Sequence, residues 1–453
     1  MKKKIIRLIL GSILIASLSG GPLFADAEPK EFVKTWPLAD GAQIAIHYQE
    51  EELTSQKDID SYTDVILSLA SEAYMEVVYE WGFDAPGFTF VEPDTNYCYD
   101  PDKTIDIYIS SGGNTKGGIR GFTGEDFLDA PCYDILDRGE NEYDAVILFP
   151  ADYKSYIESS RGDRVTDKKM LEEMKGTLTH EMLHVILYSY NKNVEPWYFY
   201  DKDCMYETGR DWYAEGLARY FEALTESYDD FFSEGFIKKK GDKLLISQEG
   251  VNFLMATPNW PFYRSRYDFA LFWAYVHHHY GMEKIEELSR AFRDITDDKA
   301  PLEAPAIIAD VLGKEFGEIY QDFALAIYLK SFDEKIEEGL NDVALRKIKL
   351  KEGASMHTVE PLANDFVRVY SPKRTDRAIE IELMEGCAQT KLTIIIEEGK
   401  EKNRTIYTTA LDEYSNRYIL DLDKLGAGRN ARVILVVTNP NDSQRVTYQI
   451  SSL

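Results

Sequence analysis

The sequence has little positive charge for its length, and this absence limits the partners it can have. Its 453 residues carry 51 Lys and Arg against 79 Asp and Glu, a formal net charge of −28. Nucleic-acid surfaces require clustered Lys and Arg, so the charge balance argues against a nucleic-acid partner. No glycine-rich stretch has the G-x-x-x-x-G-K-[ST] spacing of a phosphate-binding loop, so nucleotide binding is not indicated either.

Long apolar runs are also missing, apart from one near the N-terminus. A basic start, Lys2 to Arg7, precedes the apolar run Leu8–Leu18, and Ala25-Asp26-Ala27 has the A-x-A pattern of a cleavage site. The run is shorter than the roughly 20 residues that span a bilayer. We therefore predict a signal peptide over residues 1–27 and a secreted or extracytoplasmic protein without a membrane span.

Cysteine is scarce, with four residues in the whole chain. In an exported protein, four cysteines permit two disulfides in three possible connectivities. A Cys98–Cys132 pair is the simplest choice because both residues flank the same strand region, and buried free thiols are an equal alternative. The other two cysteines are Cys204 and Cys387.

What is abundant is apolar and aromatic sequence, at 44% and 13% of residues, which is enough to form packed cores. The length favours two or three domains. Residues 28–165 have a mixed pattern, and residues 28–59 fit the first strands of this region better than a prosegment. The spacing predicts a helix over Asp60–Gly82 and strands over Phe88–Pro93, Thr104–Ser110 and Asp144–Pro150.

Residues 166–349 are expected to be mostly helical, and residues 350–453 to be all-β. The predicted helices are Asp167–Tyr190, Trp212–Thr225, Arg266–Tyr280, Met282–Ile295, Leu302–Leu312 and Lys314–Ser331. After residue 350, short alternating runs separated by turn signals are typical of a β-sandwich. The whole chain is thus expected to be an α+β protein with a C-terminal β-sandwich domain.

One stretch inside the first of these helices, "GTLTHEMLHVILYSY", has the spacing of a metal site. Residues four apart lie on one face of a helix, so His180 and His184 can direct their imidazoles at one ion. Glu181 would flank that ion and take a proton from zinc-bound water. Because a hydrolytic zinc site has three protein ligands, a third ligand is needed. Glu215, in "DWYAEGLARYFEAL", is the candidate.

The two stretches together resemble the gluzincin (peptidase MA-like) zinc metallopeptidases, whose pattern is H-E-x-x-H followed by W-x-x-E-G-x-A-x-x-x-E. The resemblance implies a zincin-like catalytic domain, with a twisted sheet before a helical part. It also implies one zinc ion, held by His180, His184 and Glu215, and Glu181 as general base. The matching residues are Trp212, Glu215, Gly216, Ala218 and Glu222.

Three other acids compete with Glu215 as third ligand, namely Glu207, Asp211 and Glu222. Glu222 lies about 10 Å further along the helix axis than Glu215, too far to share its ion. It fits either a role in orienting an imidazole or a surface position. Glu207 and Asp211 match no pattern.

The resemblance reaches three further places. In aminopeptidase N-like relatives a tyrosine binds the oxyanion, and this role is carried to Tyr267, with Tyr263 as the reserve, although packing is an equal alternative. The substrate-pairing edge strand would fall at Gly118–Thr123, where a surface turn is an equal alternative. His277, His278 and His279 point about 100° apart, so we expect them to cap a helix rather than bind a metal.

These observations predict a zinc metallopeptidase acting on peptides or proteins. The G-A-M-E-N signature of aminopeptidase N-like enzymes is absent, which favours an endopeptidase. The alternative is a non-catalytic exported binding protein on the same scaffold. The β-sandwich is expected to be accessory, contacting substrate, glycan or cell surface, or stabilising the catalytic part. Calcium could bind an acidic loop but is unsupported, since a solvated loop fits several times better; its acids are Asp126, Asp129, Asp134 and Asp137.

Overall fold

The structure is a computed structural model of the whole chain, and it describes most residues from Glu31 onward. The predicted signal peptide, the predicted strands Phe88–Pro93 and Gly118–Thr123, Glu207, and the cysteines Cys98, Cys204 and Cys387 lie outside the described residues. The described residues are 31–39, 41–49, 56–85, 104–110, 132–139, 142–161, 164–190, 211–225, 228, 230–233, 236–240, 243–247, 250–292, 300–349, 354–370, 378–385, 389–398, 403–411, 416–425, 428 and 431–453.

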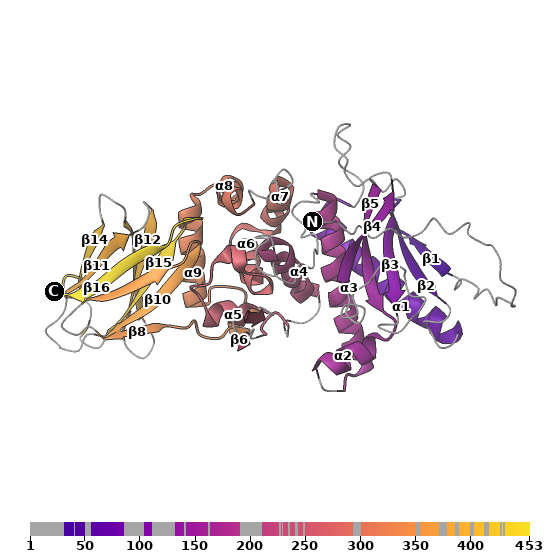
Figure 1. Cartoon of the computed structure of the whole chain (residues 1–453), viewed down its shortest axis with the longest axis horizontal. Coiled ribbons are helices and arrows are strands. Elements are labelled where there is room, and N and C mark those ends of the chain that lie inside the picture. The colour runs from indigo at the N-terminus through magenta and orange to yellow at the C-terminus, as the bar shows by residue number, and fades with distance from the viewer. Residues whose placement is uncertain are drawn as a thin grey trace, which may run out of the picture. The chain divides into compact units, whose positions relative to one another are not determined.

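The chain contains both helices and several β-sheets, as the α+β prediction requires (Figure 1). It divides into two compact units. The first comprises Met1–Lys192 with Leu224–Ser227, and the second comprises Asn193–Ala223 with Tyr228–Leu453.

A five-stranded sheet forms the centre of the first unit, in the order β1-β2-β3-β5-β4. The inner strands β2, β3 and β5 run parallel to one another, whereas β1 and β4 pair antiparallel at the edges. Parallel strands buried on both faces read as continuous apolar runs, which is why the predictions for β3 and β5 were close. The strands are β1 (Glu31–Pro37), β2 (Gln43–Gln49), β3 (Thr104–Ser110), β4 (Cys132–Gly139) and β5 (Glu142–Pro150).

Helices pack on this sheet, with α1 against α3 and α3 against β5. α3 spans the predicted residues, and it begins where the Thr166 hydroxyl accepts the backbone N–H of Lys169 at 3.3 Å. An ion pair joins α3 to the π-helix that follows α1, because Lys175 Nζ lies 2.6 Å from Glu76 Oε1. The helices are α1 (Gln56–Tyr74), continuing as the π-helix η1 (Met75–Glu80), α2 (Tyr153–Arg161) and α3 (Asp167–Tyr190).

The second unit begins with helices around an aromatic core. Trp212 on α4 stacks on Trp273 on α6, with ring centroids 6.0 Å apart, and Phe262 and Phe269 pack edge-on against Trp212. The helices are α4 (Asp211–Thr225), α5 (Val251–Ala256), α6 (Ala270–Tyr280), α7 (Met282–Ala291), α8 (Ala300–Leu312), α9 (Phe316–Leu329) and α10 (Glu334–Gly339). Two 3₁₀ turns, η2 (Phe262–Arg264) and η3 (Tyr267–Phe269), and a hairpin of β6 (Phe236–Lys240) and β7 (Lys243–Ser247) complete this part.

Apart from α3, the predicted helices differ from the structure in their bounds, and two of them show the cause. The helix expected over Arg266–Tyr280 begins at Ala270, because a 3₁₀ turn occupies residues 267–269. The helix expected over Lys314–Ser331 spans Phe316–Leu329 and ends where Lys330 adopts a left-handed conformation, φ 55°. Sequence periodicity located the apolar face of both helices. It did not locate the turn at which α6 begins or the residue at which α9 ends.

Two further sheets follow, and one hydrophobic cluster draws residues from both. Their orders are β13-β12-β15-β10-β8 and β14-β11-β16-β9. The short strands β8 and β9 were not predicted, whereas the other seven lie where alternating runs were found. The strands are β8 (Arg346–Lys349), β9 (Ser355–Val359), β10 (Ala363–Tyr370), β11 (Ala378–Glu385), β12 (Thr390–Glu398), β13 (Asn403–Leu411), β14 (Arg417–Asp421), β15 (Arg432–Asn439) and β16 (Val446–Ser452).

Candidate metal centre

Two imidazoles of α3 meet at one point. His180 and His184 are one helical turn apart, and their Nε2 atoms lie 3.2 Å from each other. Both side chains are buried, at 7% and 1% exposed. Two neutral rings can share one hydrogen bond at this distance, whereas a cation between them would engage both nitrogens at once.

The carboxylate of Glu215 on α4 belongs to the same group. One ligand atom from each of His180, His184 and Glu215 lies within 4.8 Å of the other two, and all three residues are buried. This buried group could hold a metal ion. Among the residues that the structure describes, Glu222 does not belong to it. The side chain of the rival Asp211 is not described, and Glu207 lies outside the described residues.

The donor set fits zinc in both chemistry and spacing. Two imidazole nitrogens and a carboxylate oxygen are ligands that zinc accepts, with one position left for water or substrate. Zinc–nitrogen bonds of about 2.0–2.1 Å in a tetrahedral site would place two nitrogens roughly 3.3 Å apart. The observed 3.2 Å between the two Nε2 atoms agrees with this spacing.

Glu181 follows His180 directly on α3 and is also buried, at 7% exposed. Consecutive helical residues point about 100° apart, so the Glu181 carboxylate lies beside the face that carries the two histidines rather than on it. This is the position at which the sequence analysis expected a general base.

A short turn before α6 is fastened to α4 next to Glu215. Arg266 Nη2 lies 3.3 Å from Glu215 Oε1, and the Arg266 backbone N–H donates to Asp268 Oδ1 at 2.8 Å. Asp268 is fully buried, and this burial raises its pKa to about 7 against the lowering effect of its hydrogen bonds. Gly216 lets the two segments approach, since a Cβ there would lie 3.1 Å from the Arg266 carbonyl oxygen.

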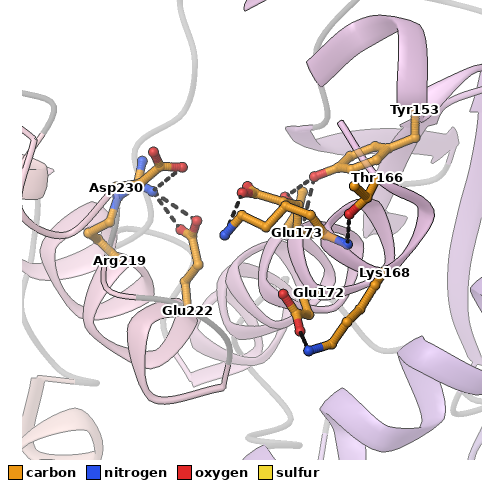
Figure 2. A network of polar contacts seen from close by, with 10 residues as sticks. Tyr153, Thr166, Lys168, Glu172, Glu173, Arg219, Glu222 and Asp230 are labelled. Carbon is orange, nitrogen blue, oxygen red and sulfur yellow. Dashed lines mark hydrogen bonds and ion pairs between the residues drawn. The ribbon is translucent and has the colours of Figure 1, made fainter. Parts of the chain in front are cut away.

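Arg219 lies one turn after Glu215 on α4 and is held by two acids. Figure 2 shows its guanidinium with dashed lines to Glu222 and Asp230. Arg219 Nη1 is 2.9 Å from both oxygens of Glu222 and 3.8 Å from Asp230 Oδ2. Burial alone would lower the pKa of Arg219, but the negative charges of Glu222 and Asp230 raise it above its ordinary value. Glu222 is therefore an arginine partner.

Tyr267 opens the turn η3, and two guanidinium groups lie over its ring. The guanidinium carbons of Arg219 and Arg266 are 4.6 Å and 5.3 Å from its centroid. The reserve candidate Tyr263 has the exposed Arg264 at 5.7 Å from its ring. Sequence reasoning singled out neither Arg219 nor Arg266. The available signal was that Arg219 stands four residues after Glu215, on the same helix face.

The three consecutive histidines do not converge. His277 Nδ1 meets the Tyr220 hydroxyl at 2.6 Å, and His279 Nε2 meets the Ser331 carbonyl at 3.3 Å, while His278 is exposed. Burial lowers the pKa of His277 and His279. All three lie in the last turn of α6, where the sequence placed them, and the lowered pKa favours the neutral forms of His277 and His279.

A second polar cluster in Figure 2 fixes the first half of α3. The Tyr153 hydroxyl donates to the Glu173 carbonyl at 3.1 Å and lies 2.6 Å from Thr177 Oγ1, which ties α2 to α3. The Glu173 carboxylate pairs with Lys169 at 3.1 Å. These contacts hold the helix that carries both histidines.

Comparison with known proteins yields no family. No protein-family model matches the chain, and no curated protein matches it. Among solved structures, the crystal structure of PirA matches with 22% sequence identity over 23% of this chain and 95% of that chain, with a TM-score of 0.16. A likeness this weak carries no argument about fold or function. Within the described residues, no helix has the length and apolar character needed to cross a membrane.

Proposed function

We propose that the protein is a zinc-dependent metallopeptidase that hydrolyses peptide bonds, with an endopeptidase preferred. The observation that carries the proposal is the buried group of His180, His184 and Glu215, with the buried Glu181 directly after the first histidine. Two imidazoles, one carboxylate and an adjacent carboxylic base are the side chains that zinc-assisted hydrolysis requires.

His180, His184 and Glu215 would hold one zinc ion per chain. When bound, zinc supplies a Lewis acid that polarises a carbonyl and lowers the pKa of water to about 7. In this proposal the Glu181 carboxylate takes one proton from the attacking water and passes it to the nitrogen of the leaving amine. The new carbon–oxygen bond forms first and leaves an oxyanion, and the bond between the carbonyl carbon and the nitrogen breaks as that nitrogen receives the proton. The Tyr267 hydroxyl donates a hydrogen bond to the oxyanion.

The finer architecture belongs to the same proposal. A zincin-like catalytic domain would occupy residues 28–349, and a β-sandwich domain would occupy residues 350–453. The sandwich is supported by the single hydrophobic cluster that the two C-terminal sheets share. Its partner would be substrate, glycan or cell surface, and secretion would follow signal-peptide cleavage near Ala27. Calcium has no part in the proposal.

The decisive experiment combines metal analysis with proteolysis. Purified protein should contain about one zinc per chain and hydrolyse casein, and a chelator should stop the hydrolysis. Glu181→Gln should keep its zinc and lose activity by at least about 100-fold. Glu173→Gln is the matched control, because Glu173 is a buried acid on the same helix and pairs with Lys169 instead.

Two results would reject the proposal. Casein hydrolysis by Glu181→Gln at the wild-type rate would remove the assigned base. A wild-type chain that binds zinc but cleaves no peptide in a broad library would favour the alternative, a non-catalytic binding protein on this scaffold.

A further inference from the structure

Tyr267 is held by two arginines that come from different segments. The Arg219 guanidinium carbon lies 4.6 Å from the ring centroid, and that of Arg266 lies 5.3 Å from it. Guanidinium groups within about 6 Å of an aromatic centroid are attracted to the ring. Arg219 comes from α4, whereas Arg266 directly precedes the tyrosine.

The guanidinium groups that lie over the ring are also paired with acids. Arg219 is held by both oxygens of Glu222 at 2.9 Å, and its side chain is only 15% exposed. Arg266 is held by Glu215 Oε1 at 3.3 Å. Ion pairs with acids of α4 therefore fix the positions of both guanidinium groups. The guanidinium groups in turn restrict the position of the Tyr267 ring.

The backbone beneath Tyr267 is fixed as well. Asp268 is fully buried and accepts the backbone N–H of Arg266 at 2.8 Å, which shapes the turn in which Tyr267 lies. Without a side chain, Gly216 lets this turn lie against α4 one residue after Glu215. The reserve candidate Tyr263 has no comparable pair among the described contacts, since its ring cation is the exposed Arg264.

We propose that Arg219 and Arg266 are positioning residues that hold the Tyr267 phenol for hydrogen bonding to an anionic oxygen. The inference rests on the proposed peptidase function, and it adds two residues that act through Tyr267. Flanking positive charge makes the phenol a stronger donor to a developing oxyanion. Because the ring is already ordered, no further side-chain entropy is lost when the phenol hydrogen-bonds to the oxyanion.

A kinetic double-mutant cycle tests this inference. Arg219→Lys and Arg266→Lys keep the charge and remove the planar contact with the ring. At saturating zinc, with bound metal measured, Tyr267→Phe should lower kcat about 100-fold. Each lysine variant should lower kcat about tenfold while KM changes less than about twofold. In the Tyr267→Phe background the same lysine substitutions should change kcat less than about twofold, because the group through which they act is gone.

Arg264→Lys is the matched control, since Arg264 is exposed and lies by Tyr263 instead. It should leave kcat within about twofold of wild type. If Arg219→Lys and Arg266→Lys lower kcat by the same factor in both backgrounds, the inference is overturned while the peptidase proposal stands.

A second readout needs neither metal nor activity. Thermal unfolding of the metal-free chain is measured for Arg219→Met, Tyr267→Leu and the double variant. The sum of the two single losses in Tm should exceed the loss in the double variant by about 2 °C. This difference is the effect expected of one cation–π contact in a unit of this size. Strict additivity would overturn the contact itself. A wild type without peptidase activity would instead reject the proposed function, and the thermal coupling would still report on the contact.

Discussion

His180 Nε2 and His184 Nε2 lie 3.2 Å apart in a buried part of α3. Two protonated imidazoles would repel each other strongly at this distance, so at most one ring is expected to carry a second proton. A divalent cation removes this conflict, because it needs both rings neutral and accepts a lone pair from each. Metal binding at these two rings is therefore coupled to their protonation and to the stability of the folded chain.

Zinc should therefore stabilise the folded chain. At a free zinc concentration 100 times Kd, a site that exists only in the folded state raises the free energy of unfolding by about 2.7 kcal/mol. Calorimetry with and without zinc measures the rise in Tm. His184→Ala should abolish the rise, whereas His278→Ala, which removes an exposed imidazole, should preserve it. An unchanged rise in His184→Ala would place the zinc elsewhere.

The third ligand can be distinguished from its neighbour on the same helix. Glu215→Ala should lower zinc affinity by at least about 100-fold, because one of three protein ligands is lost. Glu222→Ala should change zinc affinity by less than about tenfold. It should instead destabilise the fold by roughly 3 kcal/mol, because Arg219 loses its closest acid in a mostly buried site. Competition with a chromogenic chelator and denaturant unfolding measure the two effects. Equal zinc loss in both variants would contradict the assignment.

The sequence was informative where one local signal determines the structure. The bounds of α3 and β3 were predicted correctly, since α3 has a capping threonine before a regular apolar pattern and β3 is a buried apolar run. The convergence of His180 with His184 follows from their spacing alone. Joining Glu215 to them depended on a resemblance, because no local rule relates residues that are 31 positions apart.

Features that depend on tertiary contacts were not predictable. The start of α6 shifted to Ala270 because the buried Asp268 carboxylate organises a turn that no propensity indicates. β8 is four residues long and is stabilised as a strand by parallel pairing with β10. The contacts of His277 with the Tyr220 hydroxyl and of His279 with the Ser331 carbonyl could not be inferred from a run of three histidines.

Acid should destabilise the C-terminal sheets through His357. The Arg346 guanidinium donates to His357 Nδ1 at 2.9 Å, and burial together with that charge lowers the His357 pKa to about 4. Between about pH 6.5 and pH 4 the unfolded chain binds a proton that the folded chain does not, so stability falls as the pH falls. At pH 4.5 the loss from this residue should be about 2 kcal/mol relative to pH 7.

The His357 effect is isolated by comparing variants. His357→Gln removes the titrating ring, so its unfolding free energy should depend less on pH between 6.5 and 4.5 than that of wild type. The nearby Asp365, whose pKa is raised by burial, contributes with the opposite sign and is common to both proteins. His278→Gln should retain the wild-type slope. Identical slopes in wild type and His357→Gln would show that His357 titrates normally.

Gly216 offers a test of how closely the turn before α6 lies against α4. In a helix interior, Gly→Ala usually stabilises by about 1 kcal/mol. At Gly216 the new Cβ would lie 3.1 Å from the Arg266 carbonyl oxygen and 3.4 Å from Ala270 N, both of them backbone atoms. Because backbone cannot rotate away, we expect Gly216→Ala to destabilise by about 1 kcal/mol. It should also displace Tyr267 and lower kcat about tenfold, with zinc still bound.

Gly317→Ala on α9 is the matched control for this substitution. Its Cβ would meet the side-chain carbon Cε of Lys391 at 2.9 Å, and a flexible lysine can move aside. Gly317→Ala should therefore be neutral or stabilising, with kcat unchanged. Denaturant unfolding and steady-state kinetics on both variants separate helix propensity from close packing. If Gly216→Ala stabilised the fold as Gly317→Ala does and left kcat intact, then close approach at residue 216 would not be what holds the turn before α6 against α4.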